Sequence, residues 1–207
     1  MWVWPAFGIP AFVFFVGLAS DNEALRVAAK PLPVLGLAAA VWATHPRTRY
    51  RRLVATALLF GSAGDLLLEL GLFEIGLGSF LIGQIIYISA FLGDTKRLQP
   101  IPALIFLIWG VGLTWALAEG AGDLLVPVAL YAVALCTMMW RSVARLGAVP
   151  AVTGVSTAVG ALLFGISDSM IAIDRFGTDI IGARWWIMIT YWAAQGLIAF
   201  GAMRREG

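Results

Sequence analysis

The chain has 207 residues, of which 61% are hydrophobic and only 13% are charged, and its mean hydropathy is +0.91. Soluble globular domains carry roughly 25% charged residues, so this composition excludes an ordinary soluble domain and predicts an integral membrane protein. The net charge of +2 is small. We interpret it as a membrane-topology signal rather than a nucleic-acid-binding surface, so no nucleic-acid partner is expected.

Eight apolar segments follow one another, each near the roughly 20 residues that a helix needs to cross a 30 Å hydrocarbon core. Their predicted bounds are residues 2–19, 31–44, 53–72, 75–93, 101–118, 124–140, 149–173 and 185–203. The second is short and begins with Pro31 and Pro33, which a first helical turn tolerates. Backbone in lipid must satisfy its own hydrogen bonds, and no linker is long enough to separate a soluble part. We therefore expect one all-α domain over residues 1–207, a polytopic membrane helical bundle with eight transmembrane helices.

The basic residues predict the orientation of this bundle. If the segments alternate in direction, ten of the 14 Lys and Arg residues fall on the side of the termini, and Arg26, Lys30, Arg175 and Arg184 fall on the other. Basic residues favour the cytoplasmic side, so both termini are predicted to be cytoplasmic. The expected location is the cell (inner) membrane, with multiple passes and membrane lipids as surroundings. Small residues on helix faces suit a monomer or an oligomer equally, so the oligomeric state stays open.

The residue inventory excludes several familiar chemistries. Cys136 is the only cysteine, and His45, the only histidine, lies in a basic loop on the predicted cytoplasmic side. An internal disulfide, a cysteine- or histidine-based metal site and a Ser-His-Asp triad each need residues that the membrane segments lack. No glycine-rich phosphate loop is present either. We expect neither a metal nor a cofactor.

Two aspartates, Asp65 and Asp168, lie inside apolar segments, and each follows the pentapeptide ALLFG, at 57–61 and 161–165. A carboxylate at bilayer depth costs about 2.5 to 3.5 kcal/mol on insertion scales, so such a residue usually faces inward and carries function. The repeated context predicts that the two aspartates belong to one shared site. A purely structural aspartate, hydrogen-bonded to a neighbouring hydroxyl, is the alternative.

A further polar set occurs in these two segments and in the segment that follows each of them, and consists of Glu69, Gln84, Tyr87, Ser167, Tyr191 and Gln195. Glu69 lies one turn after Asp65 and either joins the site or reaches interfacial water from the helix end. Gln84 and Tyr87 are three residues apart, and Tyr191 and Gln195 are four apart, so each pair places an amide and a phenol on one helix face. Such pairs also suit interhelical hydrogen bonds of about 0.6 kcal/mol. Ser167 offers a hydroxyl donor beside Asp168.

Topology allows these groups to meet. The segments that carry the two aspartates run in the same direction, and both aspartates fall past the midpoint, towards the outer side. The next segments return inward, with Gln84 and Gln195 near their middles, and Lys30 precedes the second segment on the outer side. We therefore expect a cavity in the outer half of the membrane. Lys30 suits either a substrate phosphate or the head groups of surrounding lipids.

The two ALLFG copies also suggest a weak internal duplication. Four segments separate them, and the segment after each copy contains a glutamine and ends in an AF pair. A duplication of this kind would give a 4+4 parallel pseudo-repeat, as in some transporters. The spacing differs, however, because the aspartate follows the glycine by four residues in one copy and by three in the other.

Several stretches resemble the YhhN family of membrane proteins, which includes lysoplasmalogenases. They are KPLPVLGL at 30–37, LLFGSAGDLLLELGLFEIGLGSFLIGQIIYISAF at 58–91, YAVALCTMMW at 131–140, GALLFGISDSMIAIDRF at 160–176 and YWAAQGLIAF at 191–200. The resemblance covers nearly the whole chain. One departure is Gln84, which stands where many relatives have histidine; glutamine can orient a group but cannot titrate.

The resemblance implies a hydrolase that cleaves the vinyl ether bond of a lyso-lipid and releases a fatty aldehyde and a glycerophospho head group. Protonation of the vinyl ether gives an oxocarbenium-like cation that water captures, so the reaction needs an acid and a base. Asp65 and Asp168 are the catalytic candidates. In the substrate-binding roles, Lys30 would meet the phosphate, Tyr87 and Tyr191 would orient water or glycerol, and Gln84 and Gln195 would bind the ether region.

Two other classes of protein remain open from the sequence. A small-molecule or proton-coupled transporter would use the same intramembrane carboxylates, and a receptor or structural protein would use them to join helices.

Overall fold

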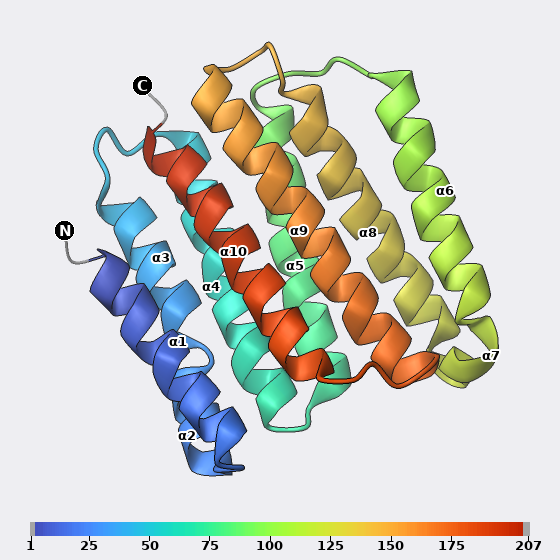
Figure 1. Ribbon diagram of the computed structural model, residues 1–207. Helices are drawn as coiled ribbons and strands as arrows, with labels where there is room; N and C mark the ends of the chain where they lie inside the picture. Colours follow the sequence, from blue (N-terminus) through green and yellow to red (C-terminus); the bar gives the residue numbers. More distant parts are fainter. Residues whose placement is uncertain (1–2, 205–207) are drawn as a thin grey trace. The chain divides into compact units, whose positions relative to one another are not determined.

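The computed structural model describes residues 3–204, apart from the side chain of Trp4, and every regular element in this range is helical (Figure 1). The elements are α1 (Val3–Ala19), α2 (Glu23–Ala29), α3 (Leu32–Ala43), α4 (Arg49–Glu69), α5 (Phe73–Leu92), α6 (Pro100–Ala116), α7 (Ala118–Ala121), the 3₁₀ helix η1 (Gly122–Leu124), α8 (Leu125–Ala144), α9 (Ala151–Phe176) and α10 (Ala183–Arg204). The predicted all-α class is confirmed.

Each predicted apolar segment coincides with a helix, namely α1, α3, α4, α5, α6, α8, α9 and α10. The predicted start of the first segment, residue 2, lies outside the described residues. The short helices α2, α7 and η1 were not predicted. α2 begins at a capping residue, Asn22, whose side chain accepts a hydrogen bond from the Leu25 N–H at 3.1 Å.

α4 and α8 each extend four residues further than predicted, because arginines that suggested solvent are bound by the protein itself. α4 begins at Arg49, capped by the Thr48 hydroxyl, and Arg51 donates to the carbonyls of Ala202 and Pro46 at 3.0 and 2.6 Å. α8 continues to Ala144. Its Arg141 donates to the carbonyls of two residues in the loop after α5, and Arg145 pairs with Asp94 in the same loop at 2.8 Å.

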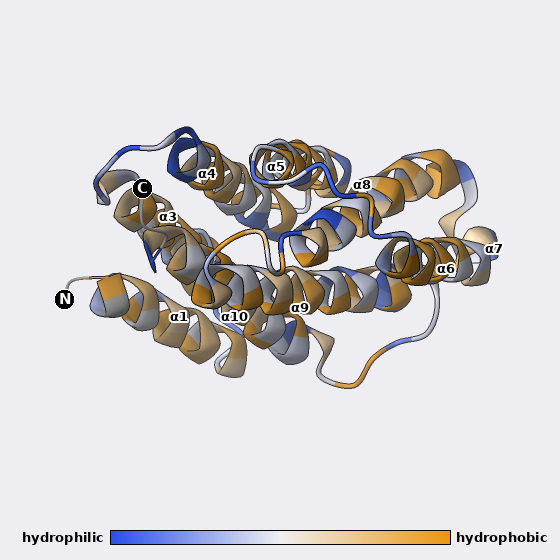
Figure 2. Ribbon diagram, turned by 90° about the horizontal axis from the view of Figure 1, so that it is seen from above, coloured by the Kyte–Doolittle hydropathy of each residue, from blue (hydrophilic) through white to orange (hydrophobic). Residues whose placement is uncertain are grey.

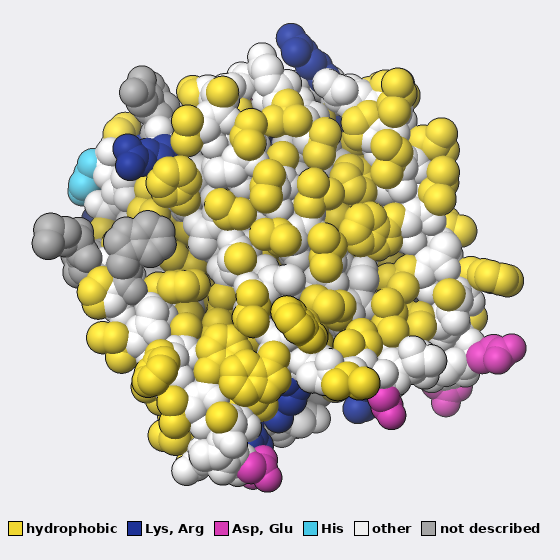
Figure 3. Space-filling model, viewed as in Figure 1, with side chains coloured by type: hydrophobic (Ala, Val, Ile, Leu, Met, Phe, Trp, Pro, Cys, Tyr) yellow, Lys and Arg dark blue, Asp and Glu magenta, His cyan; other side chains and the backbone are white. Residues whose placement is uncertain are grey.

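Five stretches within the described residues are long and apolar enough to cross a membrane: Glu23–Ala43, Phe73–Leu92, Ala118–Ala144, Ala151–Phe176 and Ala183–Arg204. α1 over Pro5–Ala19 and α6 are shorter apolar helices. Hydrophobic side chains cover much of the face in Figure 3, and apolar colouring dominates the helices in Figure 2. Side chains such as Trp115 are 82% exposed, as expected where the surroundings are lipid. The protein is a multi-pass membrane protein.

The chain divides into two compact units, each described here by itself. The first contains residues up to Ala90 and those from Ala202 on. Here α1 packs against α2 and α3, and α3 packs against α4. α4 also contacts α5 closely at Gly64, where an added Cβ would lie 2.6 Å from the Phe80 ring. This glycine therefore sets the distance between the two helices beside Asp65.

The second unit runs from Phe91 to Gly201 and contains α6, α7, η1, α8, α9 and most of α10. α8 packs between two partners, because it contacts both α6 and α9. α9 and α10 approach closely at Gly160, where a Cβ would lie 2.8 Å from the Ala194 carbonyl oxygen. This close approach brings the polar residues of α10 against the helix that carries Asp168.

Candidate active site

In the first unit, Asp65 is almost fully buried on α4, with 2% of its surface exposed. One turn earlier, the Ser62 hydroxyl donates to the Pro31 carbonyl at 2.9 Å and holds α4 against the start of α3. Gln84 and Tyr87, on α5, are each 1% exposed. All three polar groups are therefore enclosed by protein rather than facing lipid.

The antiparallel register of α4 and α5 sets the depth of these groups. Gly64 meets Phe80 and Gly76 meets Leu68, so Asp65 lies level with Ser79. At 1.5 Å per residue, Gln84 lies about 7 Å and Tyr87 about 12 Å further along α5. Gln84 is thus roughly one helical turn from the aspartate, and Tyr87 is two.

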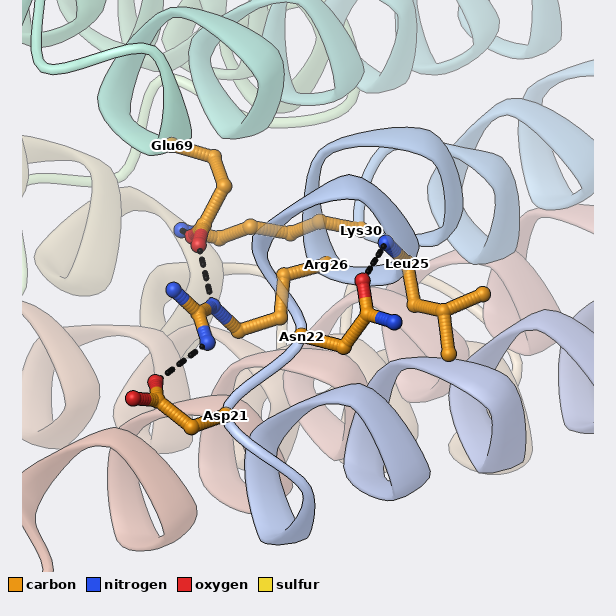
Figure 4. Close-up of polar contacts among 6 residues, drawn as sticks. All are labelled: Asp21, Asn22, Leu25, Arg26, Lys30 and Glu69. Carbon is orange, nitrogen blue, oxygen red and sulfur yellow. Dashed lines mark hydrogen bonds and ion pairs between the residues drawn. The ribbon is translucent and has the colours of Figure 1, made fainter.

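A group of four charged side chains joins α2 to the end of α4 (Figure 4). Glu69 lies between two cations: its Oε1 accepts from Arg26 Nε at 3.1 Å, and its Oε2 pairs with Lys30 Nζ at 3.0 Å. Arg26 also pairs with Asp21 at 2.9 Å. The side chains of Arg26 and Lys30 are 11% exposed and that of Glu69 only 4%, whereas Asp21 is 97% exposed. We call these four residues the outer ion cluster, after the side of the membrane on which the sequence predicts Arg26 and Lys30 to lie.

The outer ion cluster corrects one alternative from the sequence. Glu69 does not reach interfacial water, because two cations enclose its carboxylate. Lys30, a candidate for phosphate or lipid head groups, is bound to this carboxylate. The sequence analysis counted Arg26 among the basic residues of the predicted outer side but did not select it as a site residue. The available signal was its spacing of four residues from Lys30, which puts both on one face of α2.

In the second unit, Asp168 on α9 is 8% exposed, and its Oδ2 accepts the phenolic hydrogen of Tyr131, from α8. Tyr131 is itself 8% exposed. Sequence reasoning did not select Tyr131, although it begins the segment YAVALCTMMW. It is the hydroxyl donor of Asp168 that sequence reasoning expected from a neighbouring serine.

The serines on either side of Asp168 bind other groups. Ser167, a substrate-binding candidate, is fully buried and donates to the Ile187 carbonyl on α10 at 3.1 Å. Ser169 donates to the Gly165 carbonyl and accepts from the indole N–H of Trp109, on α6, at 3.1 Å. Together with the bond from Tyr131, these contacts mean that α6, α8 and α10 all hold the segment around Asp168 through hydrogen bonds.

On α10, the Gln195 amide donates to the Tyr191 phenolic oxygen at 3.4 Å, and both residues are at most 3% exposed. The Tyr191 ring packs edge-on against Phe164, with centroids 5.7 Å apart. The contacts between α9 and α10 place Asp168 level with Trp186. Tyr191 therefore lies about 7 Å and Gln195 about 13 Å further along α10, which repeats the axial spacing of the first unit.

The two aspartates belong to different units, so their meeting in one cavity stays a prediction. Among residues 3–204, no group of three or more His, Cys, Asp or Glu side chains is arranged to hold a metal ion. The chemistry that these clusters offer is proton transfer by carboxyl groups and hydrogen bonding by phenols and amides.

Comparisons with known proteins identify relatives of the chain. A model of the YhhN family matches residues 25–202. The protein named lysoplasmalogenase TMEM86B from Homo sapiens is 37% identical over 177 residues, which cover 84% of this chain and 74% of the relative. A protein named lysoplasmalogenase from Mycobacterium tuberculosis is 34% identical over 219 residues, covering 97% and 80% of the two chains. The Sus scrofa lysoplasmalogenase TMEM86B is 32% identical, covering 96% and 84%. No solved structure matches.

Proposed function

Because this chain belongs to the YhhN family, we propose that it is a membrane-embedded hydrolase that cleaves the vinyl ether bond of a lysoplasmalogen-type lyso-lipid. The products are a fatty aldehyde and a glycerophospho head group. The observation that carries this proposal is the similarity, over most of the chain, to proteins named lysoplasmalogenase in both a mammal and a bacterium. The proposed partners are the lyso-lipid substrate and the surrounding membrane lipids.

The two buried aspartates supply the acid and the base. The acid protonates the vinyl carbon that is not bound to oxygen, which leaves an oxocarbenium-like cation. The base takes a proton from the attacking water, so a hemiacetal forms. The hemiacetal then loses its hydroxyl proton, its carbon–oxygen bond to glycerol breaks, and the glycerol oxygen takes up a proton. One water is consumed, and the acid and base return to their starting states.

Tyr131 supports this chemistry from α8. Its hydroxyl donates to one oxygen of Asp168. A hydrogen bond to a carboxyl group also fixes the orientation of the side chain, which matters because a proton transfer requires close alignment. Tyr131 is a positioning residue in this proposal.

The remaining polar residues have supporting roles. Gln84 and Tyr191 lie about one turn from their aspartates and would orient the ether and the water. Tyr87 and Gln195 lie about two turns from their aspartates and would act through other side chains. Gln195, for example, donates a hydrogen bond to Tyr191. Ser167 holds α9 to α10. In the outer ion cluster, a substrate phosphate would compete with Glu69 for Lys30 and Arg26.

The membrane arrangement is part of the proposal. We place the protein in the cell (inner) membrane with eight crossings and both termini in the cytoplasm, as a single domain. A helix at each of the eight predicted segments, and five stretches of the described residues that are long and apolar enough to cross a membrane, support the crossings. The matching axial spacing of amide and phenol after each aspartate supports a 4+4 pseudo-repeat, although the order of the two groups differs.

The test is an assay of aldehyde release by the purified protein in lipid nanodiscs, with a lysoplasmalogen as substrate. Asp65→Asn and Asp168→Asn remove the titratable groups and should each lower the rate by about a hundredfold or more. The matched control is Asp123→Asn, because Asp123 is an exposed aspartate in η1. Full activity in both aspartate variants would reject the mechanism, and no aldehyde from the wild type would reject the activity.

A further inference from the structure

A groove with a volume of about 470 Å³ lies between α6 and α8 in the second unit. Its existence follows from small residues, since Gly110 and Ala118 line one wall and Ala129 and Ala132 line the other. Among its lining residues, only Thr114, Trp115 and Cys136 carry a polar side-chain atom, and none is charged. A water molecule needs two to four polar partners, so this groove favours hydrocarbon.

The groove has the length of a lipid tail. Its wall on α8 runs from Leu125 to Cys136, which corresponds to about 16 Å at 1.5 Å per residue. One leaflet of a membrane contributes about half of the 30 Å hydrocarbon core. Lining residues such as Val111 and Val133 are 60% and 66% exposed, so the groove opens to the surrounding lipid.

The two helices that form the groove also hold Asp168. Trp109, next to Gly110 on α6, donates to Ser169, and Tyr131, next to Ala132 on α8, donates to Asp168. A tail in the groove would therefore contact Gly110 and Ala132, the immediate neighbours of the two residues that hold Asp168 and Ser169 in place. No charged side chain lines the groove to bind a head group.

We infer that the groove between α6 and α8 is the binding site for the single hydrocarbon tail of the lyso-lipid. This inference rests on the proposed function and deepens it by assigning the tail. One groove between two helices accommodates one chain, so it selects a lyso-lipid over a two-chain phospholipid. The carbons next to the ether oxygen lie where the groove passes Tyr131, the residue that donates to Asp168.

The first test measures binding without hydrolysis. A non-hydrolysable alkyl ether lysophospholipid with a diazirine on its tail is photolysed with the Asp168→Asn variant in nanodiscs, and labelled residues are mapped by mass spectrometry. We expect labels within residues 106–118 and 125–136, which an excess of unlabelled lyso-ether lipid removes and a diacyl phospholipid does not. Equal competition by both lipids, or labels spread evenly over other exposed apolar side chains, would overturn the inference.

The second test narrows the groove. Val133→Trp places a large ring at its exposed edge, and the matched control is Leu130→Trp, on the same helix, 60% exposed and outside the groove. Val133→Trp should reduce groove labelling and lower kcat/KM for a long-tailed substrate by about tenfold, with less effect on a short tail. Ala129→Phe should act in the same way. Equal effects of the Val133 and Leu130 variants would contradict the assignment.

The two proposals fail separately. If the wild type releases no aldehyde but the groove is labelled selectively, the tail site stands and the reaction is wrong. If aldehyde is released but the groove is neither labelled nor sensitive to Val133→Trp, the reaction stands and the tail site is wrong.

Discussion

Tyr131 on α8 donates its phenolic hydrogen to Asp168 on α9, and both side chains are buried in the same unit. This bond joins two residues 37 positions apart in the sequence. It explains how an aspartate inside an apolar helix is accommodated, because a buried polar group without a partner would cost several kcal/mol in lipid. It also supplies a direct test of the catalytic proposal.

Tyr131→Phe should lower the rate of aldehyde release by about tenfold to a hundredfold, since a hydrogen bond to a charged group contributes about 1.5–3 kcal/mol. The ring remains, so the packing between α8 and α9 should persist. The control is Thr137→Val, which removes a hydroxyl from the same helix that bonds only to the carbonyl of Val133 within α8. A rate in Tyr131→Phe equal to that of the control would exclude a positioning role.

Glu69→Gln should destabilise the protein more than Asp21→Asn does, because Arg26 and Lys30 then lose a shared counter-ion whose side chain is only 4% exposed. Denaturant unfolding in mild detergent measures this change. Asp21→Asn removes the other carboxylate of the outer ion cluster, but that group is 97% exposed and should contribute no more than about 1 kcal/mol. If the two variants unfolded at the same denaturant concentration, the burial of Glu69 would have no energetic consequence.

Gly64→Ala should destabilise the protein by about 1–3 kcal/mol and reduce activity, because the new methyl group would overlap the Phe80 ring beside Asp65. Gly78→Ala is the matched control, since a Cβ at Gly78 meets nothing within 4 Å and alanine favours the helix by about 1 kcal/mol. Thermal unfolding of the two variants should therefore shift in opposite directions. A stabilised Gly64→Ala would mean that α5 moves away without cost.

The double variant Asp65→Asn with Asp168→Asn tests whether both carboxyl groups act on one bond. Groups that work as a unit are not additive, so the double variant should retain about the same residual rate as the slower single variant. Rates of aldehyde release by the three variants, measured at equal protein concentration, decide the point. Rate losses that multiply would indicate two independent contributions.

The positions of the helices could be predicted because they depend on local properties of the chain. Each of the eight predicted apolar segments coincides with a helix, since backbone in lipid has few alternatives to a helix, and five stretches of the described residues are long and apolar enough to cross a membrane. The errors lie at the ends. Arg49 and Arg141 suggested loops, yet each lies in a helix. Arg51, in the same helix as Arg49, and Arg141 itself bind carbonyl oxygens of distant segments. Periodicity cannot reveal such acceptors.

The candidate site was predicted only in part. Asp65, Asp168, Gln84 and Gln195 stand out because a polar residue in an apolar segment is costly, and all four are buried. Tyr131 and Arg26 were missed, because tyrosine and arginine are common near membrane interfaces and their partners lie on other helices. Ser167 was predicted beside Asp168 but donates to a carbonyl on α10.

The sequence by itself determined the class of protein, the eight longer helices and the two carboxyl groups inside them, because hydropathy and the cost of a charge in lipid act residue by residue. The tertiary structure alone decided which side chains pair. It assigned Tyr131 to Asp168, placed Glu69 between Arg26 and Lys30, and left a groove where small residues of α6 and α8 meet. Pairing depends on helix faces and on axial register, and these are set by close contacts such as that of Gly64 with Phe80.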